Sequence, residues 1–302
     1  MGMAGYRHQL YADSLAEFGT PVALPQCGGW MLQRGTPGGG FQDATGCYPL
    51  FCCRDWQTLG DDLHQIGTGL VCLSLVADPF GNHSEELLRS LFDIVRPFKQ
   101  HYVADLHRPL EEFSSARHRK YGRRVLRCVG VEVCSDPAAW LDEWVGLYGC
   151  LAERHAIRGL RRFSREALAR QLAVPGLIMF RAFEGQETLG LDLWYVSGDV
   201  AYGHLVGISP RGYELQVSYG LKLFLLQYFA GRVRWVDLGG VSGISGSEGS
   251  GLAQFKQGWA SETRTVFFCG KVFDRAAYAE LTRLANRNGE GYFPAYRAGE
   301  FS

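Results

Sequence analysis

Three strand-like segments near the middle of this 302-residue chain constrain its fold more than any other feature. Residues 177–183, 189–196 and 200–208 are rich in β-branched and aromatic side chains, and only short segments separate them. The two connections, Gly185-Gln186 and Ser197-Gly198-Asp199, have the glycine and polar residues of tight hairpin turns. The pattern therefore predicts an antiparallel meander of three strands.

Helix and strand patterns on both sides of the meander extend this prediction. Asp136-Pro137 begins one helix, and Ser164 begins a second helix that ends before Pro175-Gly176. After the meander come an apolar helix, a strand, a glycine-rich loop, a strand and a helix, at residues 214–229, 233–238, 239–251, 265–269 and 274–285. The sequence thus predicts an α/β fold, more narrowly α+β, in which helices flank a mixed, mostly antiparallel sheet.

The first part of the chain shows a weaker pattern. Residues 70–76 predict a buried strand, residues 84–95 a helix capped by Ser84, and residues 101–106 another strand. A basic helix is expected at 117–127. We place a domain boundary near residue 115, which gives a shortened N-terminal domain, 1–115, and a C-terminal domain, 116–302. Residues 1–45 are rich in turn formers and yield no assignment of helices or strands.

Composition excludes several classes of protein. Hydrophobic residues make up 46% of the chain, which is enough to bury a core. Lys+Arg and Asp+Glu both number 31, and this balance argues against a protein whose whole surface follows nucleic acid. The nine cysteines lack paired C-x-x-C spacing, which favours reduced thiols. Because the sequence has no apolar run of about 18 residues and no signal-peptide core, we expect a cytoplasmic protein without a transmembrane helix.

Three sequence features resemble FemAB-like proteins, which have tandem GNAT folds. The basic helix 117–127 lies between two predicted strands, and Ile208-Ser209-Pro210 precedes the long helix. Asp237-Leu238-Gly239-Gly240 leads through the glycine-rich loop to Phe255-Lys256-Gln257-Gly258-Trp259, which is similar to the Phe-Lys-x-Gly-Phe segment of the family. The resemblance covers residues 100–285 and extends more weakly to 45–100. It implies a duplicated GNAT-like fold with a shortened first copy.

The resemblance also implies a function, the transfer of an acyl or aminoacyl group to an amine or hydroxyl. FemAB-like proteins include transferases that add amino acids from charged tRNA to cell-wall precursors. The implied co-substrate is acyl-CoA or aminoacyl-tRNA, with no tightly bound cofactor and a small-molecule, saccharide or lipid-linked acceptor. Two alternatives stay open: a non-catalytic ligand-binding protein on a GNAT fold, and an aminoacyl-tRNA-dependent transferase that acts on a cell-envelope precursor.

Three residues are candidates for catalysis. Asp237 ends an apolar strand, where ligand-facing residues often lie, and its carboxylate could act as a base or cap the next turn. His204 could take a proton near neutral pH or be a structural residue of the meander, which also holds Asp192. Tyr213, near the helix start, is a candidate general acid by the resemblance. We expect direct attack of the acceptor on the donor carbonyl, with the oxyanion held by a backbone N–H of a splayed strand.

The donor is expected at the start of the long helix, where exposed amides can bind an anion. Arg211, Gly212, Ser218 and Tyr219 are the candidate donor-binding residues, although Ser209–Ser218 does not match the Arg/Gln-x-x-Gly-x-Gly/Ala pattern and Arg211-Gly212 could be an ordinary turn. The glycine-rich loop 239–251 matches neither a P-loop nor a dinucleotide fingerprint. It is either a surface loop or a lid over the acceptor.

Basic and aromatic residues suggest where phosphate or acceptor groups bind. Lys256, near Trp259, could contact a phosphate or carboxylate, or could be a surface lysine beside core aromatics. Arg119, Arg123 and Arg124 of the basic helix could bind phosphates of tRNA, a nucleotide-sugar, a lipid or CoA, or could form a solvated helix face. No H-E-x-x-H or paired C-x-x-C spacing predicts a metal site.

Overall fold

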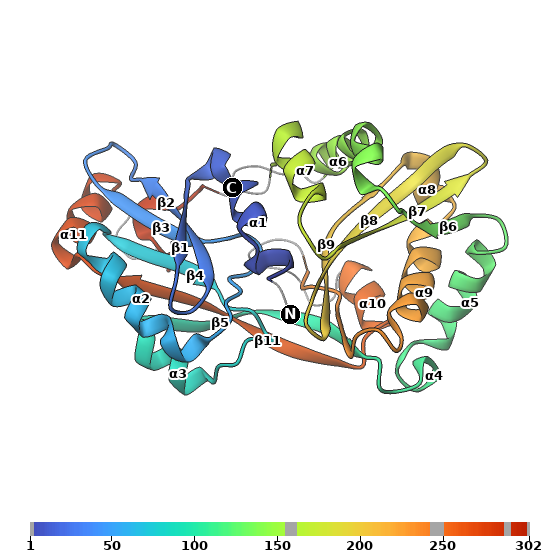
Figure 1. Cartoon of the computed structure of the whole chain (residues 1–302), viewed down its shortest axis with the longest axis horizontal. Coiled ribbons are helices and arrows are strands. Elements are labelled where there is room, and N and C mark those ends of the chain that lie inside the picture. The colour runs from blue at the N-terminus through green and yellow to red at the C-terminus, as the bar shows by residue number, and fades with distance from the viewer. Residues whose placement is uncertain (1–2, 155–161, 242–250, 287–290, 301–302) are drawn as a thin grey trace. The chain divides into compact units, whose positions relative to one another are not determined.

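The computed structural model describes residues 3–154, 162–241, 251–286 and 291–300, and the chain forms two compact units (Figure 1). The first unit comprises Met1–Gly5, Lys99–Ile157 and Gln171–Thr265. The second comprises Tyr6–Phe98, Arg158–Arg170 and Val266–Ser302. Among the described residues, none of the helices combines the length and the apolar character that crossing a membrane requires.

The first unit is built on a sheet with strand order β5-β10-β9-β8-β7-β6. Its strands are β5 (Ile94–Asp105, which belongs to this unit from Lys99 on), β6 (Gly130–Val133), β7 (Leu177–Glu184), β8 (Glu187–Ser197), β9 (Val200–Ile208) and β10 (Trp235–Asp237). Strands β7, β8 and β9 form the predicted antiparallel meander. Gly185 and Gly198 in its two turns both have φ of 60°, a conformation that glycine adopts without strain. Only β9 and β10 pair in parallel among these strands.

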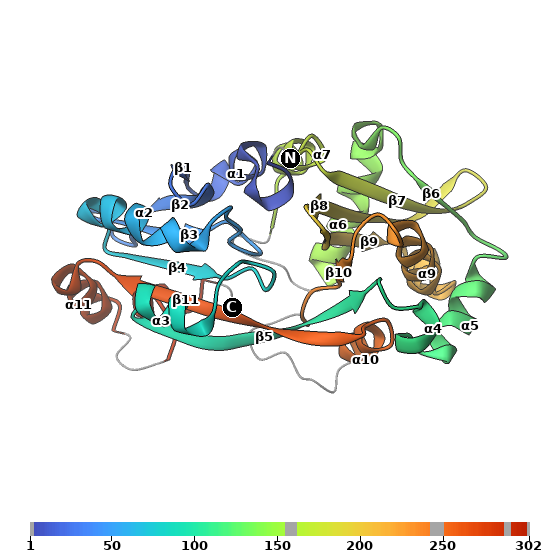
Figure 2. The ribbon, with the colours of Figure 1, turned by 60° about the horizontal axis from the view of Figure 1, so that its bottom comes forward.

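Helices cover both faces of the meander. Adjacent residues of a strand point to opposite faces. Gly207 of β9 lies against Trp144 and Leu147 of α6 (Leu141–Arg154), so close that an added Cβ would lie 2.8 Å from the Cβ of Leu147. Ile208 instead joins the core formed with α9 (Val217–Phe229). Helix α5 (Ala116–Val125) packs beside α9 (Figure 2). The remaining helices of this unit are α4 (Leu110–Phe113), α8 (Pro210–Glu214) and α10 (Gly251–Gln257).

The second unit has strand order β1-β2-β3-β4-β11, with β3 and β4 as the parallel pair. The strands are β1 (Thr20–Leu24), β2 (Gly29–Gly35), β3 (Gln42–Gly46), β4 (Cys72–Val76) and β11 (Glu262–Val272). Its helices are α1 (Gln9–Asp13), α2 (Leu59–Ile66), α3 (Glu85–Leu91) and α11 (Arg275–Leu284), and most of α7 (Arg165–Leu172) belongs here. Trp56, Leu59 and Leu63 from the α2 region pack into its core with Leu73 and Leu75 of β4.

The two units repeat one topology, which accounts for the predicted duplication. In each unit an antiparallel three-stranded meander leads through a helix to a strand parallel to the third one: β1-β2-β3-α2-β4 and β7-β8-β9-α9-β10. The chain then exchanges strands, because β5 follows β4 but pairs with β10, and β11 follows β10 but pairs with β4. Each unit is therefore assembled from separated segments, whereas the sequence predicted two continuous domains divided near residue 115.

Two predicted elements differ from the structure. The predicted helix 84–95 ends at Leu91, and Ile94 and Val95 begin β5. The β-branched Ile94 and Val95 suit a strand, and the carboxylate of Asp93 holds it beside β11 by accepting the backbone N–H of Val272 at 2.8 Å. The predicted helix 214–229 is two helices, α8 and α9, because Gln216 has a left-handed backbone with φ of 58°. The overall prediction of a mixed, mostly antiparallel sheet flanked by helices is confirmed.

Candidate functional site

A buried carboxylate lies at the end of β10 in the first unit. Asp237, the last residue of β10, is 2% exposed. Its carboxylate is 2.8 Å from Nδ1 of His101 on β5 and accepts the backbone N–H of Gly239 at 2.8 Å. Strands β5 and β10 pair here, so the backbone holds the two side chains together. The N–H of Gly239 also fixes the turn that follows the strand.

The Asp237 contact determines how His101 can react. An ionised carboxylate only accepts hydrogen bonds, so Nδ1 of His101 carries the proton that Asp237 accepts. Nε2 of the neutral ring is then an acceptor, and it has no hydrogen-bond partner among the described residues. A histidine oriented by a carboxylate in this way is equipped to take a proton from a bound substrate.

Lys256 of α10 lies beside the same turn. Its Nζ donates to the carbonyl oxygen of Gly240 at 2.6 Å. Burial lowers the pKa of Lys256 from 10.5 to about 8, which Asp237 opposes by favouring the charged form. The ammonium form still predominates at pH 7, but its proton is given up more readily than that of an exposed lysine.

Two further lysines and an aspartate complete this charged group. Lys222 of α9 donates to Asp192 of β8 at 2.6 Å, and its side chain is 13% exposed. Lys99 of β5 donates to the carbonyl oxygen of Val241 at 3.1 Å. Lys99, Lys222 and Asp192 all act electrostatically on Lys256. We call the six residues Lys99, His101, Asp192, Lys222, Asp237 and Lys256 the β10 cluster. With a neutral histidine, it has a net charge of +1 and favours an anionic ligand or transition state.

Backbone pairing ends next to the β10 cluster. Strand β9 pairs with β10 only at Val200, Ala201 and Tyr202, but continues to Ile208. Past Asp237, the chain stays with β5 instead, since Leu238 donates to the carbonyl oxygen of Tyr102 at 2.9 Å. The edge of β9 beyond Tyr202 therefore has no strand partner among the described residues. The expected mechanism requires such a splay, because it leaves backbone N–H groups for an oxyanion.

His204 is placed in a structural environment. Burial lowers its pKa to about 3, so the imidazole is neutral at physiological pH. Its Nε2 lies 3.1 Å from Oε1 of Gln171, and its ring centroid lies 4.8 Å from that of Tyr195. His204 is also the additional residue of a β-bulge opposite Leu193 and Trp194. The contacts account for His204 without catalysis, and its role as a base stays a prediction.

At the start of α8, the two groups predicted to bind an anion already have partners within the protein. The N–H of Gly212 donates to Oγ of Ser209 at 3.0 Å, and Pro210 has no N–H. Arg211 forms ion pairs with Glu184 and Glu214, at 3.7 and 3.0 Å. The predicted donor site at Arg211 and Gly212 is thus already paired within the protein, which disfavours the usual pyrophosphate contact of acyl-CoA.

The other predicted aromatic residues divide between surface and core. Tyr213 is 39% exposed and lies under the guanidinium of Arg154, at 4.1 Å from ring centroid to carbon, and its role as a general acid stays a prediction. Trp259 is fully buried. Tyr219 packs with Phe255 at 5.0 Å between ring centroids. Ser218 lies in the first turn of α9, which has no side-chain cap.

The basic helix α5 uses some of its arginines for packing. Arg119 donates to the backbone oxygen and hydroxyl of Ser114, which ends α4. Arg124 donates to Oε1 of Gln216 at 2.9 Å. Arg123 is exposed, as are Arg117, Lys120 and Arg127. The helix therefore keeps an exposed basic face while Arg119 and Arg124 also stabilise its neighbours.

The structure brings together Asp237 and Lys256, which the sequence identified, with residues that the sequence did not identify as functional. His101 appeared only as part of a predicted strand, and Lys99 and Lys222 were not singled out. No local signal marks them, because His101 and Asp237 are separated by 136 positions and meet only through strand pairing. No group of side chains in the described part of the chain is arranged to hold a metal ion.

Solved structures of known proteins share this arrangement of elements. FemX superposes with a TM-score of 0.66 and 13% identity, covering 90% of this chain and 93% of FemX. The C-terminal domain of a "Putative Lysylphosphatidylglycerol Synthetase" from Agrobacterium fabrum gives 0.63 and 15%, with 93% of both chains covered. L-PGS from Bacillus licheniformis gives 0.58 and 12%, with 95% of this chain and 98% of that one covered.

The chain has a FemAB-like, GNAT-type fold. The coverage includes both units, so the FemAB-like fold describes the duplicated topology as a whole. At identities of 12–15%, the likeness concerns the fold. No family model and no curated protein sequence matches the chain.

Proposed function

We propose that this protein is a transferase that moves an acyl or aminoacyl group onto an amine or hydroxyl by direct attack. The observation that carries the proposal is the contact between Asp237 and His101, 2.8 Å long, next to the low-pKa ammonium of Lys256. Acyl transfer can use a histidine base and a cation beside a strand edge, here the part of β9 that extends beyond its pairing with β10. The FemAB-like fold supports the proposal, since FemX and L-PGS share it.

The proposed reaction assigns each proton. The nitrogen or oxygen lone pair of the acceptor attacks the donor carbonyl, and Nε2 of His101 takes the proton that the acceptor loses. The resulting oxyanion is stabilised by N–H groups of the β9 edge and by the ammonium of Lys256. Collapse breaks the bond to the leaving oxygen or sulfur, which receives the proton from His101. Asp237 stabilises the imidazolium that exists between these two transfers.

The α8 contacts favour an aminoacyl ester over acyl-CoA as donor. The pyrophosphate of acyl-CoA binds to free N–H and cationic groups. Ser209 and two glutamates already engage these groups at Gly212 and Arg211, which leaves only the uncapped first turn of α9. We therefore propose aminoacyl-tRNA as the donor. The acceptor is proposed to be a small-molecule, saccharide or lipid-linked compound of the cell envelope.

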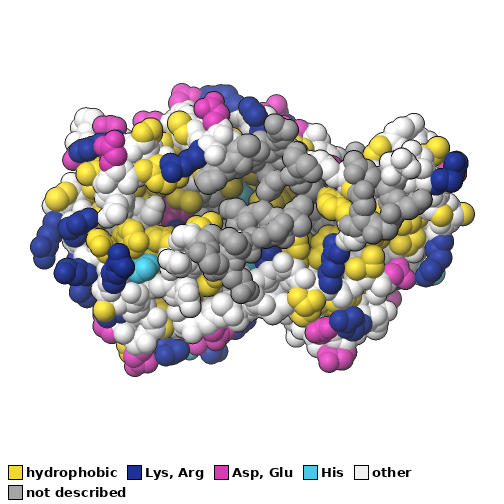
Figure 3. All heavy atoms as spheres, turned by 180° about the vertical axis from the view of Figure 1, so that it is seen from behind, with side chains coloured by type: hydrophobic (Ala, Val, Ile, Leu, Met, Phe, Trp, Pro, Cys, Tyr) yellow, Lys and Arg dark blue, Asp and Glu magenta, His cyan; other side chains and the backbone are white. Residues whose placement is uncertain are grey.

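The exposed face of α5 supports a polyanionic donor. Arg117, Lys120 and Arg123 are exposed along α5, and Arg127 is exposed just after its end. Figure 3 views the molecule from behind, so α5, which lies at the right in Figure 1, falls on the left there, and basic side chains gather at that left edge. Such a patch binds phosphates through charge, so donor binding should weaken as salt increases.

A melting experiment with candidate donors tests the choice of donor. A ligand that binds only the folded protein raises its melting temperature. We expect bulk charged tRNA to raise it in low salt and to lose this effect in high salt, whereas a panel of acyl-CoAs leaves it unchanged. A shift with an acyl-CoA and none with tRNA would instead assign the donor to the CoA thioesters.

A transfer assay tests the residues. Loss of the labelled aminoacyl group from charged tRNA is followed with a pool of nucleotide-sugars and phospholipids as acceptors. His101→Asn removes the basic nitrogen and should slow transfer by about 100-fold or more. His107→Asn, an exposed histidine six positions away, is the matched control and should transfer at the wild-type rate. A non-catalytic binding protein would bind the donor and show no difference among the three proteins.

A further inference from the structure

An open groove with a volume of about 700 Å³ lies in the second unit, and none of the residues that line it belongs to the β10 cluster. Polar side chains from β1, β2, β3 and the segment 297–300 line it, among them Thr20, Gln33, Arg34, Gln42, Arg297 and Glu300. The segment 16–19 completes the lining with Glu17, whose carboxylate accepts the backbone N–H of Ser164 at 3.0 Å. Its size is within the range of small-molecule sites.

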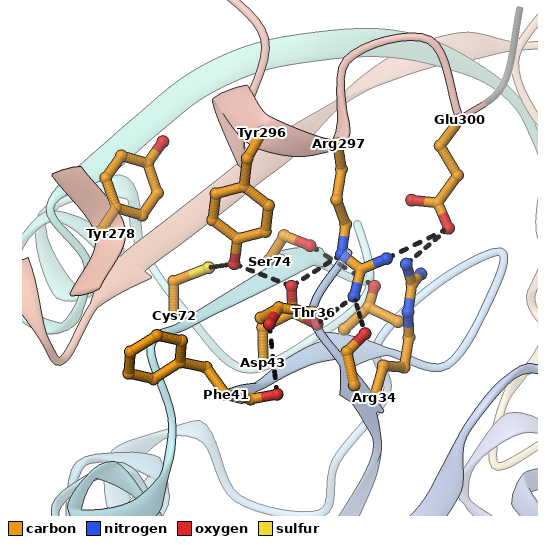
Figure 4. A network of polar contacts seen from close by, with 12 residues as sticks. Arg34, Thr36, Phe41, Asp43, Cys72, Ser74, Tyr278, Tyr296, Arg297 and Glu300 are labelled. Carbon is orange, nitrogen blue, oxygen red and sulfur yellow. Dashed lines mark hydrogen bonds and ion pairs between the residues drawn. The ribbon is translucent and has the colours of Figure 1, made fainter. Parts of the chain in front are cut away.

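Arg34 is the distinctive group of this groove. Its side chain is only 8% exposed, and its only hydrogen-bond or ion-pair partner in the described chain is the carboxylate of Glu300, 2.5 Å from one guanidinium nitrogen (Figure 4). The side chain of Glu300 is more exposed, at 26%. A buried guanidinium offers five N–H groups in a fixed plane, and one carboxylate oxygen engages only part of them.

The second arginine of the groove is fixed by a different carboxylate. Arg297 donates from Nε and one terminal nitrogen to both oxygens of Asp43, at 2.7 and 2.9 Å. The hydroxyl of Tyr296 also donates to Asp43, at 2.8 Å, and lies 3.1 Å from Sγ of Cys72 (Figure 4). Arg297 also lies 3.9 Å from the Glu300 oxygen that contacts Arg34, but its closer contacts are to Asp43. Arg34 is therefore the cation whose only charge partner among the described residues is Glu300.

We propose that the groove is a binding site for a carboxylate ligand and that Glu300 occupies it in the structure described here. If Glu300 moves away, Arg34 becomes a buried cation without a partner, which is unfavourable. An external carboxylate that pairs with Arg34 removes this cost and can therefore take the place of Glu300. Hydroxyl and amide groups of Thr20, Gln33 and Gln42 line the groove and suit a polar ligand body. The site does not depend on the proposed transfer reaction, because none of its residues belongs to the β10 cluster.

Titration with a small carboxylate tests the proposal. The probe is N-acetylglycine, and N-acetylglycinamide is its uncharged counterpart; binding is followed by NMR and calorimetry on the whole chain. An internal occupant weakens the apparent affinity in proportion to the fraction of molecules that it blocks. If Glu300 holds nine of ten molecules, Glu300→Ala should bind the carboxylate about tenfold more tightly than the wild type.

The controls separate this site from general charge effects. Glu280→Ala removes an exposed carboxylate of the same unit and should bind like the wild type. Arg34→Lys, made in the Glu300→Ala background, keeps the charge but not the planar fork and should lose most of the gained affinity. Each variant is first shown to melt as a folded protein. Equal binding by wild type and Glu300→Ala, or equal binding of the carboxylate and the amide, would overturn the proposal, as would tighter binding of inorganic phosphate.

Discussion

Replacing Lys256 by methionine should stabilise the protein while abolishing transfer. Burial lowers the pKa of Lys256 from 10.5 to about 8. A difference of one in pKa corresponds to about 1.4 kcal/mol, so keeping the ammonium charged at pH 7 costs the folded state about 3 kcal/mol. The hydrogen bond to Gly240 offsets about 1–2 kcal/mol of this. Lys256→Met should therefore raise the free energy of unfolding by about 1–2 kcal/mol, and the melting temperature by about 2–4 °C.

The stability difference between Lys256→Met and the wild type should also depend on pH, which gives an independent test of this prediction. Between pH 8 and 10.5 the unfolded chain binds more protons at Lys256 than the folded chain does, so wild-type stability rises with pH over this interval. The advantage of Lys256→Met should shrink accordingly from pH 7 to pH 10.

Urea denaturation at pH 7, 8.5 and 10 measures the free energies of unfolding. Lys120→Met, at an exposed position of α5, is the control and should change stability by less than about 0.5 kcal/mol at any of these pH values. A variant of Lys256 that is less stable than the wild type, with a difference that does not vary with pH, would refute the reasoning.

Three further outcomes follow from the structure. Because the folded pKa of His204 is about 3, the wild type should lose about 2 kcal/mol of stability from pH 6.5 to 5 as the unfolded chain takes up a proton, and His204→Gln should lose less in acid denaturation. Gly212→Ala should destabilise by about 1–3 kcal/mol in urea, since a backbone carbonyl lies 2.3 Å from the added Cβ, whereas Gly146→Ala meets no atom within 4 Å and should not destabilise. Reversing charge on α5 with Lys120→Glu and Arg123→Glu should weaken tRNA binding, measured by filter retention, and flatten its salt dependence without altering the melting temperature.

The sequence predicted the elements whose signals are local. Hairpin glycines and apolar alternation define the meander, and Asp136, Ser164 and Asp274 cap helices in the structure as their positions indicate. The hairpins of β1, β2 and β3 were not predicted, because turn-forming residues surround short strands there. The strand exchange of β5 and β11 was not predicted either, since no local residue pattern specifies which distant strand each one pairs with.

The candidate site was predictable in part for the same reason. Asp237 was identified from its place at a strand end and Lys256 from a short motif. His101 depends on the pairing of β5 with β10, which only the tertiary structure provides. Conversely, His204 and Arg211 have residue types suited to chemistry, but Gln171, Glu184 and Glu214 already engage them. The glycine-rich segment proposed as a lid lies largely outside the described residues, so that prediction stays open.

The most direct test of the account is the single-turnover rate of aminoacyl loss from charged tRNA, with the protein in excess and acceptors present. The account predicts that the wild type transfers the label to an acceptor, and that His101→Asn binds the charged tRNA equally but transfers about 100-fold more slowly or worse. Equal transfer rates for the wild type and His101→Asn would contradict the assignment of the β10 cluster as the catalytic centre.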